Sequence, residues 1–337
     1  MRTIAAFVVA AAVSVLAVTI QITPVHAQAT RTWVSSSGSD GNGCSQALPC
    51  LTFSHALSVT SAGGEISCLT PGDFGGVIIQ KAISIDCAGT GAFISNGFCP
   101  FVNGTSACGA IIVEAGATDV VRLRGLSLMA PSNILNDNGI RFVSGAALHV
   151  RNCVIANYSQ IGTGGVGNSG MGIWFNPASG TTASLYVQDT IISNNGLSQG
   201  GGGIVVQPVG SVAARVELNR VAMENNFNGF FANATQSSGI IGVQIRDTVV
   251  TGSASNGIAA FASSGAASIT VDHSSSNLNL VGIFAHGASA FVFLNGATVM
   301  SNQTGLSSEA GGSIFSYQNN AILNGSDAAP TGTIGPK

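Results

Sequence analysis

The chain has 337 residues, a formal net charge of −3 and only 7% charged residues, far below the quarter that is usual in globular proteins. Its few lysines and arginines form no basic patch, which argues against nucleic-acid binding. Glycine reaches 45 residues, and with abundant Ser, Thr and Asn it favours stacked strands and tight turns over helices. The length fits two ordinary domains or one large repeat fold.

Residues 1–27 are predicted to be a signal peptide. Arg2 provides a positive start, residues 4–20 are almost continuously apolar, and Val25-His26-Ala27 ends in the small residue that a signal peptidase needs. The alternative is an uncleaved membrane anchor, for which the apolar run is short. No later segment is apolar for long enough to span a bilayer, so we expect a secreted, periplasmic or cell-surface protein without a transmembrane span in its mature part.

Residues 28–82 are predicted to form an N-terminal cap and the first strands. Residues 33–35 have the composition of a strand, and Thr52 precedes apolar residues at helical spacing, including Phe53 and Leu57. Thr52 is therefore placed as the N-cap of a short helix. A repeat fold must shield its first core layer, and a short amphipathic helix is a reasonable lid.

Six of the seven cysteines precede residue 110, which indicates disulfides in an exported protein. The local candidate pairs are Cys44–Cys50, Cys68–Cys87 and Cys99–Cys108. Other pairings among these six cysteines remain open on sequence grounds. Cys153 is left over, and we predict a buried thiol rather than a reactive one.

Residues 83–326 carry a pattern that returns every 23 to 38 residues. Each unit begins with a hydrophobic anchor two residues before a polar or small residue. The anchors are Ile85, Leu123, Val150, Val187, Leu218, Ile245, Val271, Leu294 and Tyr317. Apolar residues at alternate positions around each anchor would all point inward from a strand. The shortest interval holds three short strands and three bends, so the pattern predicts an all-β parallel solenoid of about nine coils, followed by a tail at 327–337.

Asparagine recurs eight residues after many anchors. The residues at this position are Asn195, Asn226, Asn279 and Asn302. Asparagine tolerates the left-handed conformation that a sharp bend needs, and stacked amides can hydrogen-bond from one coil to the next. We therefore expect an asparagine ladder at one bend of the solenoid.

Three sets of motifs resemble those of a known superfamily. They are the cap-like Trp33-Val34-Ser35 and Pro49-Cys50-Leu51-Thr52-Phe53, the first-coil Gly63-Gly64-Glu65-Ile66 and Ile83-Ser84-Ile85, and the repeat unit Val187 to Ile204. They resemble the right-handed parallel β-helix of the pectin lyase-like superfamily, and more narrowly its secreted bacterial β-helix repeat proteins of unestablished role. The resemblance covers nearly the whole mature chain and implies a right-handed parallel β-helix with a short N-terminal cap helix. The superfamily contains lyases, hydrolases, esterases, tailspikes and adhesins, so it constrains fold more than function.

Polar residues two positions after the anchors form an outward stripe, which is the candidate catalytic row. Its members are Asn152, Asp189, Arg220, Asp247 and His273. Carboxylates two coils apart would be separated by about 9.6 Å, at the far end of the range for inverting glycoside hydrolysis. In the alternative, which we favour, Arg220 pairs with Asp189 and Asp247 in a structural ladder.

Family motifs for catalysis are incomplete. Asp272-His273-Ser274 resembles part of a pectate lyase motif, but the arginine pair and the acidic cluster for calcium are missing. Ala285-His286-Gly287 stands where a polygalacturonase would have Gly-His-Gly. No His or Cys spacing suggests zinc, and there is no calcium-binding repeat, so no metal or cofactor is expected.

Aromatic residues could stack on sugars where they are exposed. Tyr158 and Trp174 border a long glycine-rich insertion and are predicted to be exposed, with Asn152 nearby as a further binding candidate. Most other aromatics are expected to fill the coil interior.

Three functions remain open from the sequence. The favoured one is a non-catalytic protein that contacts polysaccharide or a cell-envelope component along one side of the solenoid. The others are a divergent polysaccharide lyase or glycoside hydrolase that uses the candidate row, and a purely structural or self-assembling solenoid. The missing motifs and scarce lysine argue against the enzyme.

Overall fold

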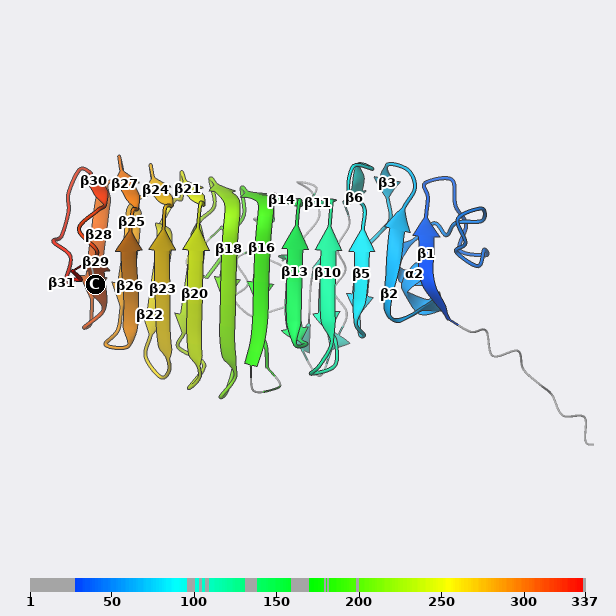
Figure 1. Ribbon diagram of the computed structural model, residues 1–337, viewed down its shortest axis with the longest axis horizontal. Helices are drawn as coiled ribbons and strands as arrows, with labels where there is room; N and C mark the ends of the chain where they lie inside the picture. The colour runs from blue at the N-terminus through cyan, green and yellow to red at the C-terminus, as the bar shows by residue number, and fades with distance from the viewer. Residues whose placement is uncertain are drawn as a thin grey trace, which may run out of the picture.

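The computed structural model describes residues 28–335, except 96–100, 103–104, 107–108, 131–137, 159–169, 179, 181 and 198–199, and except the side chains of 101–108. More than half of these residues belong to strands, and almost all of the strands pair in parallel and stack into one elongated right-handed β-helix (Figure 1). The predicted signal peptide, Cys99 and Cys108 lie outside the described residues. No helix in the described part is long and apolar enough to cross a membrane.

One face of the solenoid is a row of strands that we call the long-strand face. It consists of β1 (Ala29–Val34), β2 (Thr60–Cys68), β5 (Ile83–Asp86), β10 (Val120–Arg124), β13 (Ala147–Arg151), β16 (Thr182–Ser193), β18 (Ala213–Glu224), β20 (Ile240–Arg246), β23 (Ala266–Asp272), β26 (Ala290–Asn295), β29 (Ser313–Ser316) and β31 (Gly332–Thr333). Every pairing along this row is parallel, as stacked coils require.

A second row of short strands follows the first after a bend. Its separate strands are β3 (Gly72–Asp73), β6 (Ala92–Ile94), β11 (Leu126–Met129), β14 (Val154–Ala156), β21 (Val249–Thr251), β24 (Ser275–Asn277), β27 (Thr298–Met300) and β30 (Ala321–Leu323). β16 and β18 run through the bend and supply the missing members. The two rows therefore form one continuous 20-stranded sheet.

The third side of the solenoid is a separate nine-stranded sheet. Its strands are β4 (Val77–Ile79), β9 (Ile111–Glu114), β12 (Asn138–Ser144), β15 (Met171–Phe175), β17 (Gly202–Val206), β19 (Phe230–Ala234), β22 (Asn256–Ala262), β25 (Val281–His286) and β28 (Thr304–Glu309). Nine stacked strands agree with the predicted number of coils. A short antiparallel pair, β7 (Phe101–Val102) and β8 (Thr105–Ser106), stands apart.

The predicted anchors form one inward column. Val187 pairs with Leu218, and Leu218 pairs with Ile245, and all three are buried. A single coil cannot bury this face alone, so stability comes from the coils above and below. The prediction is wrong only at the last anchor, because Leu294 pairs with Ser316 rather than with Tyr317. Ser316 is buried because its hydroxyl accepts hydrogen bonds from Gln318 and Asn320, which leaves Tyr317 exposed.

The N-terminal end contains the predicted cap helix, α2 (Phe53–Val59). Thr52 Oγ1 accepts a hydrogen bond from the His55 amide at 3.1 Å, as an N-cap should. Phe53 is fully buried and its ring lies 5.2 Å from that of Phe74. Disulfides join Cys44 to Cys50 and Cys68 to Cys87, as predicted.

The C-terminal end is covered by the predicted tail, which returns along the last coil. The Ala328 amide donates to the Leu306 carbonyl, and β31 pairs with β29. The backbone of the final long strand is therefore partly paired within the chain.

Cys153 is buried, with 3% of its surface exposed, and it is free. Burial raises the pKa of its thiol to about 11. A protonated buried thiol fits the predicted structural role.

Candidate functional site

The candidate catalytic row lies at the bend between the long and short strands, which we call the outer bend. All five members have positive φ, from 45° at His273 to 53° at Arg220. Glycines with positive φ occupy the equivalent positions in other coils, Gly125 after the anchor Leu123 and Gly296 after Leu294. From the coil of Leu123 onward the bend has a left-handed residue at this position, which favours Asn, Asp and Gly. Backbone geometry alone thus accounts for much of the recurrence at this position.

Ion pairs, rather than a catalytic pair of carboxylates, organise the row. Arg220 Nε lies 2.6 Å from Asp189 Oδ1, and Arg220 Nη2 lies 3.1 Å from Asp189 Oδ2. Arg151 lies 3.8 Å from the same carboxylate. The hydrogen bond from Arg220 holds the pKa of Asp189 below its ordinary value. Among the described ion pairs none joins Arg220 to Asp247, so the expected ladder is present on one side of Arg220.

Asp272 and His273 form a second polar group farther along the solenoid. His273 Nδ1 lies 3.0 Å from Asp272 Oδ1, and Arg246 Nε lies 3.4 Å from Asp272 Oδ2. Asn295 donates to the same carboxylate at 2.6 Å. Asp272 is therefore held by its neighbours, whereas the His273 side chain is two-thirds exposed. The row does not converge on one point, and its catalytic role stays a prediction.

The predicted exposure of Tyr158 is wrong. Its side chain is 1% exposed, and burial raises the pKa of its hydroxyl. Tyr158 lies eight residues after the anchor Val150, at the ladder position, and its amide donates to Asn195 Oδ1 at 3.0 Å. That spacing was the signal in the sequence that could have placed it inside.

Trp174 is half-buried on the outer side of the nine-stranded sheet. The guanidinium of Arg141 lies 4.4 Å from the centre of its ring, and its indole nitrogen is buried. The ring thus packs within the protein instead of forming an open sugar platform. Asn152 is exposed at the outer bend, whereas Trp174 belongs to the nine-stranded sheet. The two residues therefore do not form one site.

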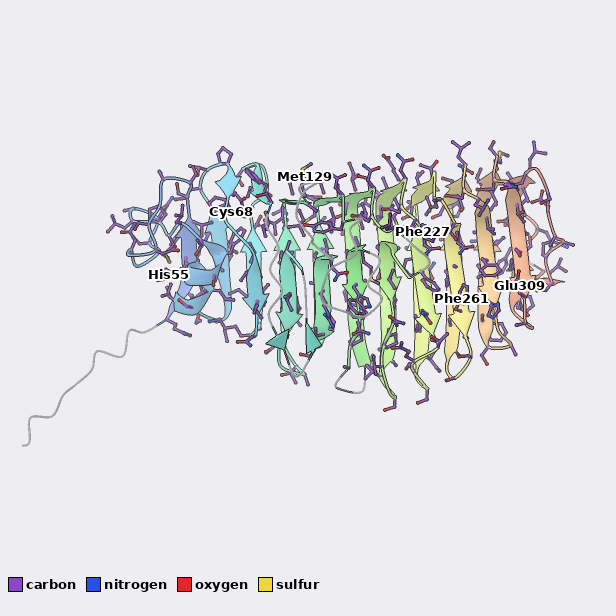
Figure 2. The ribbon with its side chains drawn as sticks, turned by 180° about the vertical axis from the view of Figure 1, so that it is seen from behind. His55, Cys68, Met129, Phe227, Phe261 and Glu309 are labelled. Carbon is purple, nitrogen blue, oxygen red and sulfur yellow. A yellow bond between two sulfur atoms is a disulfide. The ribbon has the colours of Figure 1, made fainter. Side chains whose placement is uncertain are left out.

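A pocket of about 570 Å³ lies on the outer side of the nine-stranded sheet, near its C-terminal end. Its lining consists of Gly200, Asn228, Phe231, Asn233, Ser255, Asn256, Phe261, Phe284, His286 and Glu309. The register places Asn233, Phe261, His286 and Glu309 in one line across four successive coils. Phe261 and Glu309 lie on the same face of the molecule (Figure 2). We call this the aromatic pocket.

Ring contacts shape the aromatic pocket. Phe261 makes edge contacts with Phe231 and Phe284, with ring centres 4.9 and 5.2 Å apart, and stacks on His286 at 5.1 Å. His286 Nδ1 lies 3.6 Å from the carboxylate of Glu309. Phe261 and Phe284 are each only partly buried, so ring surface remains for a ligand.

The sequence predicts that most of these aromatics fill the coil interior. The alternation along β19 explains the difference, because Phe230 points into the core and Phe231 points outward. The neighbouring outward positions are Val205, Ala259 and Phe284. A correct register of the third strand in each coil could have found this outer line, but the long loops before that strand hide it.

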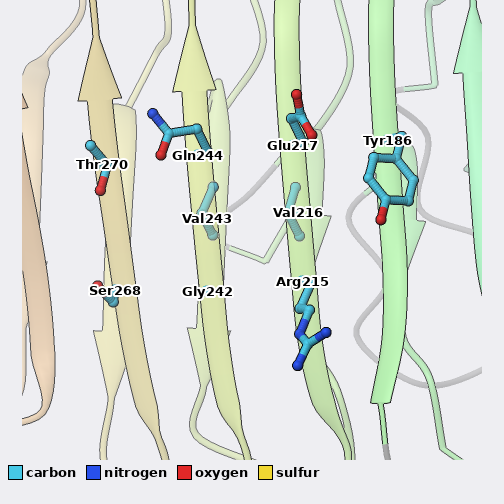
Figure 3. Close-up of a pocket in the computed structure, with 9 residues that line it drawn as sticks. All are labelled: Tyr186, Arg215, Val216, Glu217, Gly242, Val243, Gln244, Ser268 and Thr270. Atoms are coloured by element: carbon cyan, nitrogen blue, oxygen red, sulfur yellow. The ribbon is translucent and has the colours of Figure 1, made fainter.

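A second, shallower hollow of about 410 Å³ lies on the long-strand face. It is lined by Tyr186, Arg215, Val216, Glu217, Gly242, Val243, Gln244, Ser268 and Thr270. Tyr186, Glu217, Gln244 and Thr270 form one line across the strands, and Arg215, Gly242 and Ser268 form the next (Figure 3). The Tyr186 ring also stacks on His149 at 4.5 Å. We call this the long-strand hollow.

A group of potential metal ligands occurs in the cap. Cys44, Cys50 and His55 have ligand atoms within 4.8 Å of one another. The two cysteines are joined in a disulfide and so offer no thiolate to an ion.

Comparisons with known proteins bear on the fold. No family profile matches this sequence, and no curated protein matches it. The solved structure of pectate lyase Pel9A is similar, with a TM-score of 0.54 and 13% identity over 90% of this chain and 79% of that one. The structure of a GH136 lacto-N-biosidase from Eubacterium ramulus matches with a TM-score of 0.45 and 9% identity over 90% of this chain and 67% of that one. With its stacked parallel sheets and its likeness to Pel9A, the chain has the pectin lyase-like parallel β-helix fold.

Proposed function

We propose that this is an exported β-helix protein that binds polysaccharide in the aromatic pocket without cleaving it. The observation that carries the proposal is the partly exposed pair Phe261 and Phe284 beside two amide side chains, Asn233 and Asn256, in one hollow. Ring surface offers contact area, and a few polar groups orient a ligand, which is the usual composition of a small-molecule site.

The amide groups are suited to sugar hydroxyls. Asn233 Oδ1 accepts hydrogen bonds from Thr235, while in the described structure its amide nitrogen meets no acceptor. Asn256 donates to Asn228 and Ser255 at 3.1 and 3.2 Å, which leaves its oxygen free to accept. One pocket thus presents both a donor and an acceptor to a ligand.

The charges of the pocket favour binding over cleavage. Among its described lining residues Glu309 supplies the one carboxylate, whereas glycoside hydrolysis generally uses two. The same lining contains neither lysine nor arginine, which would be needed to hold the carboxylates of an acidic polysaccharide. We therefore expect a neutral polysaccharide to bind better than a polyuronate.

Export is supported by two features. The signal-like segment at residues 1–27 and the two disulfides of the cap fit an oxidising compartment. We therefore propose that the mature protein is secreted, periplasmic or attached to the cell surface.

A glycan array followed by affinity measurement tests the proposal. Phe261→Ala should weaken the binding of a neutral oligosaccharide about tenfold, equivalent to roughly 1.4 kcal/mol, because it removes the central ring. The matched control is Phe293→Ala, a partly buried phenylalanine of the long-strand face that stacks on Phe315. Equal losses from both variants, or no binding of any glycan, would contradict the proposal.

Catalysis in the same pocket is the second candidate, favoured by one observation. The His286 imidazole and the Glu309 carboxylate are 3.6 Å apart, a pair that can transfer a proton. Cleavage would be the function if a bound polysaccharide released new reducing ends or unsaturated products and if His286→Gln abolished that release.

A further inference from the structure

The long-strand hollow contains two opposite charges that the protein itself leaves unpaired. Arg215 and Glu217 are both exposed, and neither takes part in an ion pair or a side-chain hydrogen bond of the described structure. On the same strand, Arg220 is held by Asp189 at 2.6 Å. The hollow thus differs from the ion-paired outer bend a few residues away.

The spacing of these charges defines the length of a ligand. Residues two apart on a strand have Cα atoms about 6.6 Å apart and project to the same side. Figure 3 shows the Arg215 side chain extending along the strand away from Glu217, so the charged ends are farther apart than the backbone positions. A single amino acid is shorter than the roughly 6.6 Å between the two Cα atoms, whereas an extended tripeptide is about 10 Å long and reaches past both positions.

We propose that the long-strand hollow binds a short peptide with both termini free. Arg215 binds the terminal carboxylate with its planar fork of donors, and Glu217 binds the terminal ammonium. This site is separate from the aromatic pocket, which lies on the other sheet, and the proposal does not depend on polysaccharide binding.

The floor of the hollow suits a peptide backbone. Gln244, Ser268 and Thr270 line it with amide and hydroxyl groups, which can bond to peptide N–H and C=O groups. Gly242 lies next to Arg215 in the register, and a Cβ built on it would meet nothing within 4 Å. That open space accepts a small side chain, and the Tyr186 ring lines the hollow two strands away.

The site is tested by titrating the full chain with trialanine and measuring binding by calorimetry or by NMR chemical-shift changes. Trialanine amide and N-acetyl-trialanine should each bind at least tenfold more weakly than trialanine. In Arg215→Gln the free acid and the amide should bind alike, and in Glu217→Gln the free and acetylated amines should bind alike. Gly242→Val should weaken all three peptides by filling the hollow.

Arg122→Gln is the matched control. Arg122 is another exposed arginine of the long-strand face, and it lies two coils from Tyr186 toward the N-terminus. It should leave trialanine binding unchanged. The proposal is overturned if doubly blocked trialanine binds as well as the free peptide, if Arg122→Gln and Arg215→Gln weaken binding equally, or if trialanine at millimolar concentration does not bind.

Discussion

Two bends of the same coil show how recurrence in a sequence can have different causes. At the outer bend, polar residues such as Asp189 and Asp247 recur on the surface with positive φ. At the bend before the nine-stranded sheet, Asn195 and Asn226 recur in the interior, where their side-chain amides are hydrogen-bonded to neighbouring coils. The first recurrence follows from backbone conformation and the second from the need to satisfy buried polar groups. Neither requires a function to explain it.

The amide ladder is longer than the sequence suggested. Asn195 Oδ1 accepts a hydrogen bond from the backbone amide of Tyr158, and Asn279 Oδ1 accepts one from that of Ser253. Asn302 Nδ2 donates to Asn324 Oδ1. The left-handed residue at this bend is the one before the ladder residue, Asn194 before Asn195 and Asn225 before Asn226. The predicted ladder is therefore confirmed, but its asparagines serve as hydrogen-bonding groups and not as left-handed residues.

The largest effect is expected from breaking the ladder. Asn226→Leu would leave the amide of Asn195 and the carbonyl of Ile192 without their partners, which are now 3.0 and 2.9 Å away. Orphaned buried groups cost about 1–3 kcal/mol each, so we expect the free energy of unfolding to fall by about 3 kcal/mol. Urea denaturation measures this change in the free energy of unfolding. Asn219→Ala, an outward asparagine of β18, should change the free energy little; an equal loss would remove the distinction between the two environments.

A moderate effect is expected from the backbone of the outer bend. Asp247 has φ of 49° and is exposed, so Asp247→Val should lower the free energy of unfolding by about 1–2 kcal/mol, the cost of a left-handed β-branched residue. Asp247→Asn and Asp247→Gly should remain close to the parent protein in thermal or urea unfolding. If Val and Asn behaved alike, backbone conformation could not explain the recurrence.

The smallest effect is expected from the charge at Asp189. The Arg220 hydrogen bond lowers the pKa of Asp189 in the folded protein from its ordinary 3.8. The resulting stability is present above about pH 4 and is lost as pH falls through the lowered pKa. Because the pair is at the surface, Asp189→Asn should cost less than about 1 kcal/mol at pH 7.

Urea midpoints of the parent protein and of Asp189→Asn, measured from pH 7 down to pH 2, check this sign. The difference between the two proteins should shrink at the acid end and in high salt. A difference that stayed constant with pH would mean that the charge of Asp189 is not what stabilises the fold.

Local patterns were sufficient for several parts of the fold. Thr52 as N-cap and Val187, Leu218 and Ile245 in one column follow from spacing along the chain. The pair Cys44–Cys50 was one of several pairings that the sequence left open. The prediction for Tyr158 is wrong because a position beside a long insertion does not imply exposure, and its distance from the anchor places it in the ladder. The prediction for Tyr317 is wrong because the inward position is occupied by Ser316, whose hydroxyl is hydrogen-bonded within its own turn.

The candidate sites were harder to predict than the fold. Phe261, His286 and Glu309 are 25 and 23 residues apart in sequence and become neighbours only when β22, β25 and β28 stack. No motif marks Arg215 and Glu217 in the sequence, and only the register places Gly242, with the open space above it, next to Arg215.

Periodic hydrophobicity by itself determined the solenoid, because burial at every alternate position requires coils in register. The recurring asparagine also marked one bend of several coils, although the left-handed residue at that bend is the one before it. Only the stacked structure decided which outward side chains meet and which are left without partners. Those contacts join different coils, and the variable loops between strands remove any constant spacing from which they could be read.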